Sequence, residues 1–77
     1  MPINVGQFAL PGLRTAQAQR KLRGTRGKTA PEIQAAVNEA VRAGSPVEST
    51  TRTLKHMGLN DKDVARYIGA GYPAAPQ

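Results

Sequence analysis

Apolar residues recur at three- and four-residue steps over three stretches of the chain, and this spacing predicts three amphipathic helices. The stretches cover residues 30–43, 46–57 and 61–68. On each, one face is apolar and the opposite face carries charged or amide side chains, as in helices that pack against a core. The predicted core consists of Ile33, Val37, Val41, Val47, Leu54, Met57, Leu59, Val64 and Ile68.

Residues that favour helix starts precede all three stretches. Thr29 and Glu32 have the spacing of a capping box before the first. Ser45 and Glu48 repeat that spacing before the second. Asn60 is a preferred N-cap for the third. The boundaries of the helices are therefore predicted independently of their apolar faces.

Glycines follow the first two predicted helices. Gly58 is placed to adopt the left-handed conformation, with Leu59 contacting Leu54 in a Schellman motif. Gly44 ends the first helix immediately before the next cap, so these helices should fold back on each other or cross steeply. We therefore predict an all-α fold with a small three-helix body over residues 29–69.

The first 28 residues lack this pattern, and we expect a basic arm that is extended or partly helical. Residues 1–12 have neither helical period nor alternation, and residues 13–23 have good helix formers but a thin apolar face. A helix there is expected only against a partner, because short isolated helices are marginal in water. Residues 70–77 form a Gly/Pro-rich tail. The predicted partner anchors at the two ends are Ile3, Val5, Phe8, Leu10 and Tyr72.

Charge divides the chain at the same place. The net charge of +6 is carried by the arm, because residues 29–77 contain five bases and five acids. A run of cations without acids favours a phosphate backbone or an acidic protein surface as its partner. These candidate binding residues are Arg14, Arg20, Lys21, Arg23, Arg26 and Lys28.

The inventory of reactive side chains predicts that the protein is not an enzyme. There is no Cys, and His56 is the single histidine, so we expect no metal, no cofactor and no small-molecule substrate. The run Gly27-Lys28-Thr29 is not a phosphate loop, because Leu22 stands where the first glycine is required. Asp61 and Asp63 are interpreted as acids that complement the dipole of a helix N-terminus.

No apolar run approaches the length of a membrane span, and the N-terminus lacks the pattern of a secretory signal. We therefore expect a protein that is neither secreted nor membrane-bound, located in a virion or in the cytoplasm.

The second and third predicted helices, joined by a short turn with a glycine, have the outline of a helix-turn-helix. Asp61 and Asp63 are acidic and stand at the start of the third predicted helix, so they disfavour an approach of this helix to DNA phosphates. The turn, His56 to Leu59, is also similar to the Met-Gly turn of ubiquitin-associated domains.

Two functions are predicted from these features. The first is a non-enzymatic structural subunit of a large assembly, such as a phage capsid or tail-junction protein, whose termini contact neighbouring subunits. The alternative is a small nucleic-acid-binding protein in which the arm binds phosphates and the hairpin positions it.

Overall fold

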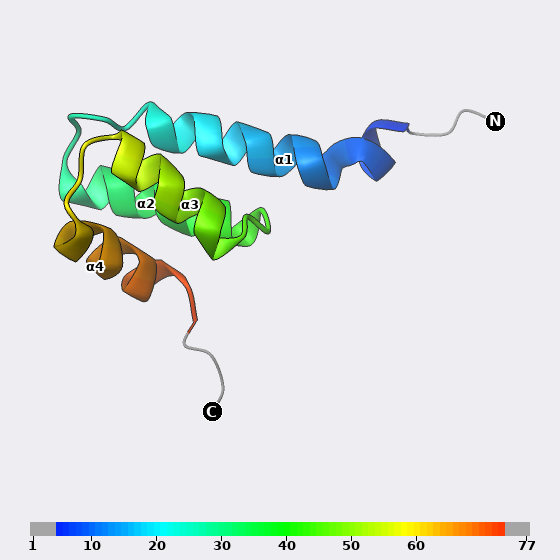
Figure 1. The fold of residues 1–77 in the computed structure, drawn as a ribbon. Coiled ribbons are helices and arrows are strands. Elements are labelled where there is room, and N and C mark those ends of the chain that lie inside the picture. Colours follow the sequence, from blue (N-terminus) through cyan, green and yellow to red (C-terminus); the bar gives the residue numbers. More distant parts are fainter. Residues whose placement is uncertain (1–4, 74–77) are drawn as a thin grey trace.

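Four helices make up the part of the chain that the computed structural model describes, which is the backbone of residues 5–73 and the side chains of residues 12–73. They are α1 (Val5–Arg23), α2 (Ala30–Arg42), α3 (Val47–His56) and α4 (Asp61–Gly71). Residues 5–73 contain no strand, so the prediction of an all-α fold is confirmed. The helices α2 and α3 lie between α1 on one side and α4 on the other (Figure 1).

The start of α2 confirms the first predicted capping box. The Glu32 carboxylate accepts the backbone N–H of Thr29 at 3.4 Å and its hydroxyl at 2.9 Å. These two hydrogen bonds lower the pKa of Glu32 below its ordinary value of 4.5, and the nearby charge of Lys28 adds to the effect. Pro31 is accommodated in the first turn, where a helix does not need that N–H as a donor.

The ends of α2 and α3 share one geometry. Gly44 and Gly58 have φ values of 88° and 91°, the left-handed conformation that favours glycine. After α3, the N–H of Leu59 donates to the carbonyl of Leu54 at 3.4 Å, which confirms the predicted Schellman motif. After α2, the N–H of Ser45 donates to the carbonyl of Ala40 at 3.0 Å in the same arrangement. Both turns therefore leave few carbonyls at these helix ends without a donor.

The second predicted capping box is wrong. Pro46, not Ser45, is the N-cap of α3, and no side chain caps this helix. The side chain of Ser45 is buried, with 3% exposed, and its hydroxyl has no hydrogen-bond partner among the described residues. Its backbone is instead recruited into the Schellman turn of α2, so the helix before it determines its position.

The last helix is longer than predicted. Asn60 caps α4 by accepting the N–H of Asp63 at 2.8 Å, as expected, but the helix continues through Gly69 to Gly71. Gly71 lies so close to α2 that a side chain there would be 2.9 Å from Cγ1 of Val37. A glycine at this point therefore permits close packing of α4 on α2 instead of ending the helix early.

The core confirms five of the nine predicted residues as buried and adds four that were not predicted. Val41, Leu59 and Ile68 are half-buried, whereas Val47 is 37% exposed because α3 begins there, at the edge of the body. Tyr67 is 5% exposed and takes the central position on α4. The predicted residues that are buried are Ile33, Val37, Leu54, Met57 and Val64, and the additional buried apolar residues are Ala18, Leu22, Ala40 and Tyr67.

The expectation of an extended or partly helical arm beside a three-helix body is revised by α1, because this helix packs into the same core as the other three. Residues 5–23 are helical, and Leu22 is fully buried in the same core cluster as Ile33, Leu54 and Val64. Ala18, with 4% exposed, lets α1 approach α2 and α3 closely. Leu22 and Ala18 form a thin apolar face. The packing of α1 is completed by polar contacts, in which Gln19 bonds to Thr50 and Thr53.

Candidate nucleic-acid interface

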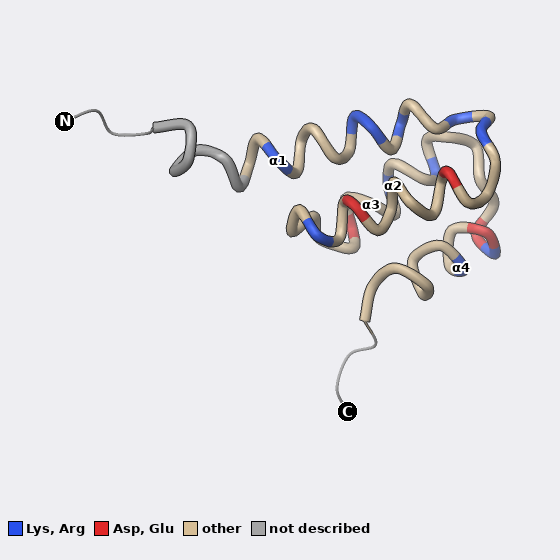
Figure 2. Tube along the Cα trace, turned by 180° about the vertical axis from the view of Figure 1, so that it is seen from behind, with Lys and Arg blue, Asp and Glu red and all other residues tan. Residues whose placement is uncertain are grey.

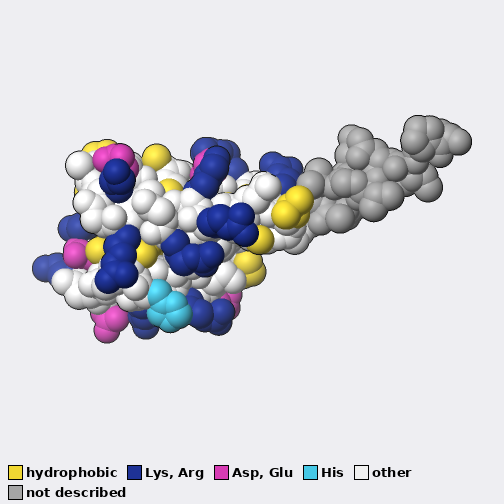
Figure 3. Space-filling view, turned by 90° about the horizontal axis from the view of Figure 1, so that it is seen from above, with side chains coloured by type: hydrophobic (Ala, Val, Ile, Leu, Met, Phe, Trp, Pro, Cys, Tyr) yellow, Lys and Arg dark blue, Asp and Glu magenta, His cyan; other side chains and the backbone are white. Residues whose placement is uncertain are grey.

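The six predicted binding residues lie along α1 and the loop that follows it, and we call them together the basic surface. Four lie on α1 and two in the loop that follows it, and all six side chains are exposed. No Asp or Glu interrupts the described part of α1 or this loop (Figure 2). Viewed from the α1 side, Lys and Arg outnumber Asp and Glu on this face of the molecule (Figure 3). The basic surface consists of Arg14, Arg20, Lys21, Arg23, Arg26 and Lys28.

Five of these six cations form no ion pair within the described residues. Within residues 12–73, Lys21 alone of the six forms an ion pair, with Nζ 3.1 Å from Oε1 of Glu39. Of the remaining described ion pairs, Lys55 with Asp61 at 3.9 Å joins α3 to α4, and Arg66 with Asp63 at 2.9 Å lies within α4. The basic surface therefore presents five cations without a carboxylate partner in this part of the chain.

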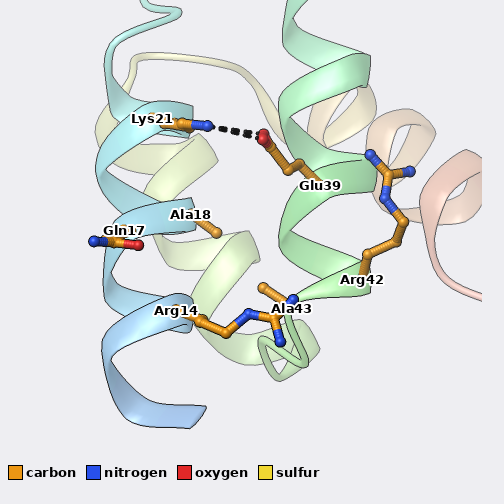
Figure 4. A pocket seen from close by; sticks show the side chains of 7 residues that line it. All are labelled: Arg14, Gln17, Ala18, Lys21, Glu39, Arg42 and Ala43. Atoms are coloured by element: carbon orange, nitrogen blue, oxygen red, sulfur yellow. Dashed lines mark hydrogen bonds and ion pairs between the residues drawn. The ribbon is translucent and has the colours of Figure 1, made fainter. Parts of the chain in front are cut away.

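The cations of α1 point in two directions. Arg14 and Lys21 extend toward α2 and line a groove of about 220 Å³ between the two helices (Figure 4). Arg20 and Arg23 do not line it, and at 100° per residue they lie on the side of α1 away from buried Ala18. One set therefore faces a groove, and the other faces solvent directly.

The loop that carries Arg26 and Lys28 is held by hydrogen bonds. The Thr25 hydroxyl donates to the carbonyl of Leu22 at 2.6 Å, and the N–H of Lys28 donates to the carbonyl of Thr25 at 2.8 Å. Gly27 adopts a φ of 81°, which a side chain would disfavour. Both cations are thus positioned by a defined turn.

A chain of polar side chains fixes α1 to the rest of the molecule. The Thr53 hydroxyl donates to Oε1 of Gln19, and Nε2 of Gln19 donates to Oγ1 of Thr50 at 3.1 Å. The hydroxyls of Thr50 and Tyr72 are 2.7 Å apart, and the Tyr72 hydroxyl donates to the carbonyl of Ser45 at 2.8 Å. We call this series of hydrogen bonds the polar relay.

The relay has a defined direction. A tyrosine hydroxyl has one proton, and the carbonyl of Ser45 can only accept it. The Thr50 hydroxyl must therefore donate to Tyr72, which leaves its lone pairs free to accept from Gln19. Every member of the series is satisfied in this arrangement, so the buried polar groups stabilise the α1–α3 contact.

The predicted anchors are placed differently. The Tyr72 hydroxyl is engaged in the relay, so within the described structure it binds its own chain. Ile3 lies outside the described residues, and the side chains of Val5, Phe8 and Leu10 also lie outside them, although their backbone belongs to α1. Their contact with a partner stays a prediction.

Other candidate chemistry is sparse in the described structure. His56 is exposed at the end of α3, and residues 12–73 hold no group of three or more potential metal ligands. The α3–α4 hairpin keeps Asp61 and Asp63 in the first turn of α4, where they oppose an approach to phosphates. None of the described helices is long and apolar enough to cross a membrane.

Comparisons with protein-family models, with curated proteins and with solved structures found no match to this chain. The candidate interface is therefore argued from the geometry and charge of its own residues. Six exposed cations on a folded helix and an ordered loop can bind a polyanion by phosphate contacts. No aromatic side chain lies between Arg14 and Lys28, so base stacking has no platform there.

Proposed function

We propose that this chain is a non-enzymatic nucleic-acid-binding protein whose basic surface contacts the phosphate backbone without reading base sequence. The observation that carries the proposal is the set of five exposed cations with no carboxylate partner in the described structure. Releasing counterions from phosphates is the main source of affinity in such contacts. The helix α1 also supplies these cations already folded, so less conformational entropy is lost on binding.

The location of the cations supports the same proposal. They run along α1 and its loop, so that they match an extended polyanion better than a single small anion. The rest of the chain, residues 29–77, has equal numbers of acids and bases. In this proposal the α3–α4 hairpin supports the fold. The nucleic acid is contacted by α1 and not by a recognition helix of the hairpin.

The salt dependence of duplex binding tests this proposal. Fluorescence anisotropy with a duplex DNA of mixed sequence should give a log–log slope against salt of about −4.5 for five phosphate contacts. Affinity should fall by roughly 10²- to 10³-fold between about 50 mM and about 200 mM salt. The absence of binding at about 50 mM salt would overturn the proposal.

A matched pair of double variants localises the contact. Arg20→Ala with Arg23→Ala should make the slope shallower by about 1.8, because two phosphate contacts are lost. Lys62→Ala with Arg66→Ala removes the same charge from α4, on the opposite side of the α2–α3 pair, and should leave the slope unchanged. Equal effects of the two pairs would show that net charge, not the basic surface, controls binding.

A structural subunit of a large assembly, such as a virion, is the second candidate. It is favoured by Leu13 on α1, a large apolar side chain that is 50% exposed. An exposed leucine can take part in the apolar centre of a contact with a neighbouring subunit. In density-gradient sedimentation of its native source, the chain should then move with a large particle after nuclease treatment, and Leu13→Asp should release it. Release by nuclease alone would favour nucleic-acid binding.

A further inference from the structure

We infer that the groove between α1 and α2 seats a backbone phosphate of the bound nucleic acid and that Glu39 is its intramolecular competitor. This inference rests on the proposed function and assigns a role to one part of the basic surface. Arg14 and Lys21 reach into the groove from α1 (Figure 4). Arg42 lines it from the end of α2, with its guanidinium turned away from α1 (Figure 4). Glu39 is the sole carboxylate among the residues that line it.

Small side chains create the space for the ligand. Ala18 lies between Arg14 and Lys21 on α1, and Ala43 faces it from the end of α2 (Figure 4). Arg14 and Lys21 are two helical turns apart, about 10.5 Å along the axis. Their side chains therefore approach the groove from its two ends, and a phosphate between them can contact both.

In the Lys21–Glu39 pair, a carboxylate of the protein itself occupies one end of this groove. Nζ of Lys21 lies 3.1 Å from Oε1 and 3.4 Å from Oε2 of Glu39. The Lys21 side chain is 69% exposed and that of Glu39 is 39% exposed, so the pair is open to solvent and to a ligand. Exposed pairs contribute little to stability, and a phosphate can displace the carboxylate without loss of the fold.

The dipole of α2 does not prevent a phosphate from binding in the groove. The end of α2 carries partial negative charge, which disfavours an anion. However, the Schellman turn engages the carbonyls of Ala40 and Val41 with the N–H groups of Ser45 and Gly44. Arg42 adds a cation at the same helix end. The local charge of the groove thus remains positive.

A phosphate is a better fit than an acidic peptide side chain because the cations continue beyond the groove. Arg20 and Arg23, on the outer side of α1, are further exposed cations that other phosphates of an extended backbone can contact. No large apolar side chain lines the groove to bind the stem of a glutamate or other residues of a peptide. A nucleic-acid strand has a negative charge at every nucleotide, so it can contact both the cations in the groove and those on the outer side of α1.

The test is a comparison of Glu39→Gln with Glu48→Gln, an exposed carboxylate on α3 that does not line the groove. Both variants raise the net charge by the same amount. Glu39→Gln should tighten duplex binding about 5- to 10-fold at about 0.1 M salt and steepen the slope by about 0.9, since Lys21 becomes available. Glu48→Gln should change affinity less than about twofold.

Two further variants tie the gain to the groove. Adding Lys21→Gln to Glu39→Gln should return the affinity to about the wild-type value, and Arg14→Gln alone should reduce it about 5- to 10-fold. Circular dichroism should show an unchanged melting temperature for each variant, because these side chains are exposed.

Four outcomes would overturn the inference. They are equal effects of Glu39→Gln and Glu48→Gln, a gain that survives Lys21→Gln, an unchanged affinity in Arg14→Gln, and tighter binding of a polyglutamate peptide than of the duplex. If the Arg20/Arg23 double variant still weakens duplex binding, the first three outcomes refute the phosphate site in the groove but leave the proposed function standing. If the wild-type chain binds no duplex at all, the proposed function fails together with the groove.

Discussion

The two outer helices, α1 and α4, pack on opposite sides of the same α2–α3 pair, but different contacts hold them there. The helix α4 buries Val64 and Tyr67 and lies directly against α2 at Gly71. The helix α1 buries one large side chain, Leu22, and adds hydrogen bonds from Gln19. A helix can thus be fixed to a small body by one apolar contact and a satisfied polar network.

The outer helices also differ in charge. On α4, Arg66 pairs with Asp63, whereas the described part of α1 carries cations and no acid. Since α1 uses little of its circumference for packing, most of its surface remains available for a ligand. The comparison indicates that α4 serves the fold, whereas α1 combines a limited packing role with the proposed binding role.

The largest expected effect is at the apolar contact of α1. Leu22→Ala should lower the free energy of unfolding by about 2–5 kcal/mol, because it removes a fully buried side chain from the shared core. Urea denaturation measures this. Leu13→Ala, at a position that is 50% exposed, is the control and should stay within about 0.5 kcal/mol of wild type. A cost below about 1 kcal/mol for Leu22→Ala would restore the view of residues 1–28 as an independent arm.

The contact of α4 with α2 gives the next effect. A Cβ at Gly71 would lie 2.9 Å from Cγ1 of Val37 and 3.0 Å from Oδ1 of Asn38, so Gly71→Ala should cost about 1–3 kcal/mol. At Gly69 a Cβ meets nothing within 4 Å, so Gly69→Ala should stabilise the helix by about 0.5–1 kcal/mol. Thermal unfolding should therefore move in opposite directions for the two variants, and a common direction would contradict the close approach.

The polar relay should contribute less than either apolar contact. Tyr72→Phe removes the acceptor of Thr50 and the donor to the Ser45 carbonyl, at an expected cost of about 1–2 kcal/mol. Tyr67→Phe is the control, because within the described residues Tyr67 accepts a side-chain hydrogen bond, from Gln34, at its backbone carbonyl and not at its hydroxyl. Amide exchange should show faster opening of residues around Gln19 in Tyr72→Phe alone. Equal protection in both variants would mean that the relay does not hold α1.

The smallest effect is the pH dependence from Glu32. Its pKa is lowered in the folded state, chiefly by the Thr29 hydroxyl, so its stabilising contribution is present above pH 4.5 and lost as the pH falls through the lowered value. Glu32→Gln should therefore show a weaker loss of stability on acidification below pH 4.5 than wild type does. Urea midpoints as a function of pH measure this, with Glu48→Gln as the charge-matched control. Parallel curves for all three proteins would refute the assignment.

Local sequence signals predicted three of the four helices because their boundaries depend on neighbouring residues. Asn60 caps α4 and Gly58 ends α3 through contacts within five residues, and the sequence alone contains both partners. Ser45 failed as a cap because the same residue belongs to the preceding turn, and two local signals competed for it.

The packing of α1 on the other helices was not predicted, because the contacts of α1 are distant in sequence. Gln19 meets Thr50 and Thr53 across more than thirty residues, and nothing in the chain marks these polar residues as partners. The same holds for the candidate site. Composition identified all six cations, but the pairing of Lys21 with Glu39, and therefore the groove, depends on how α1 lies on α2.

The one-way arrangement of the polar relay restricts its protons. Series of hydroxyls can often reverse all their protons together, which gives two states of equal energy. Here the terminal carbonyl of Ser45 cannot donate, so the reversed state does not exist. The relay therefore has a single proton arrangement, in which Gln19 of α1 is hydrogen-bonded to both Thr50 and Thr53 of α3.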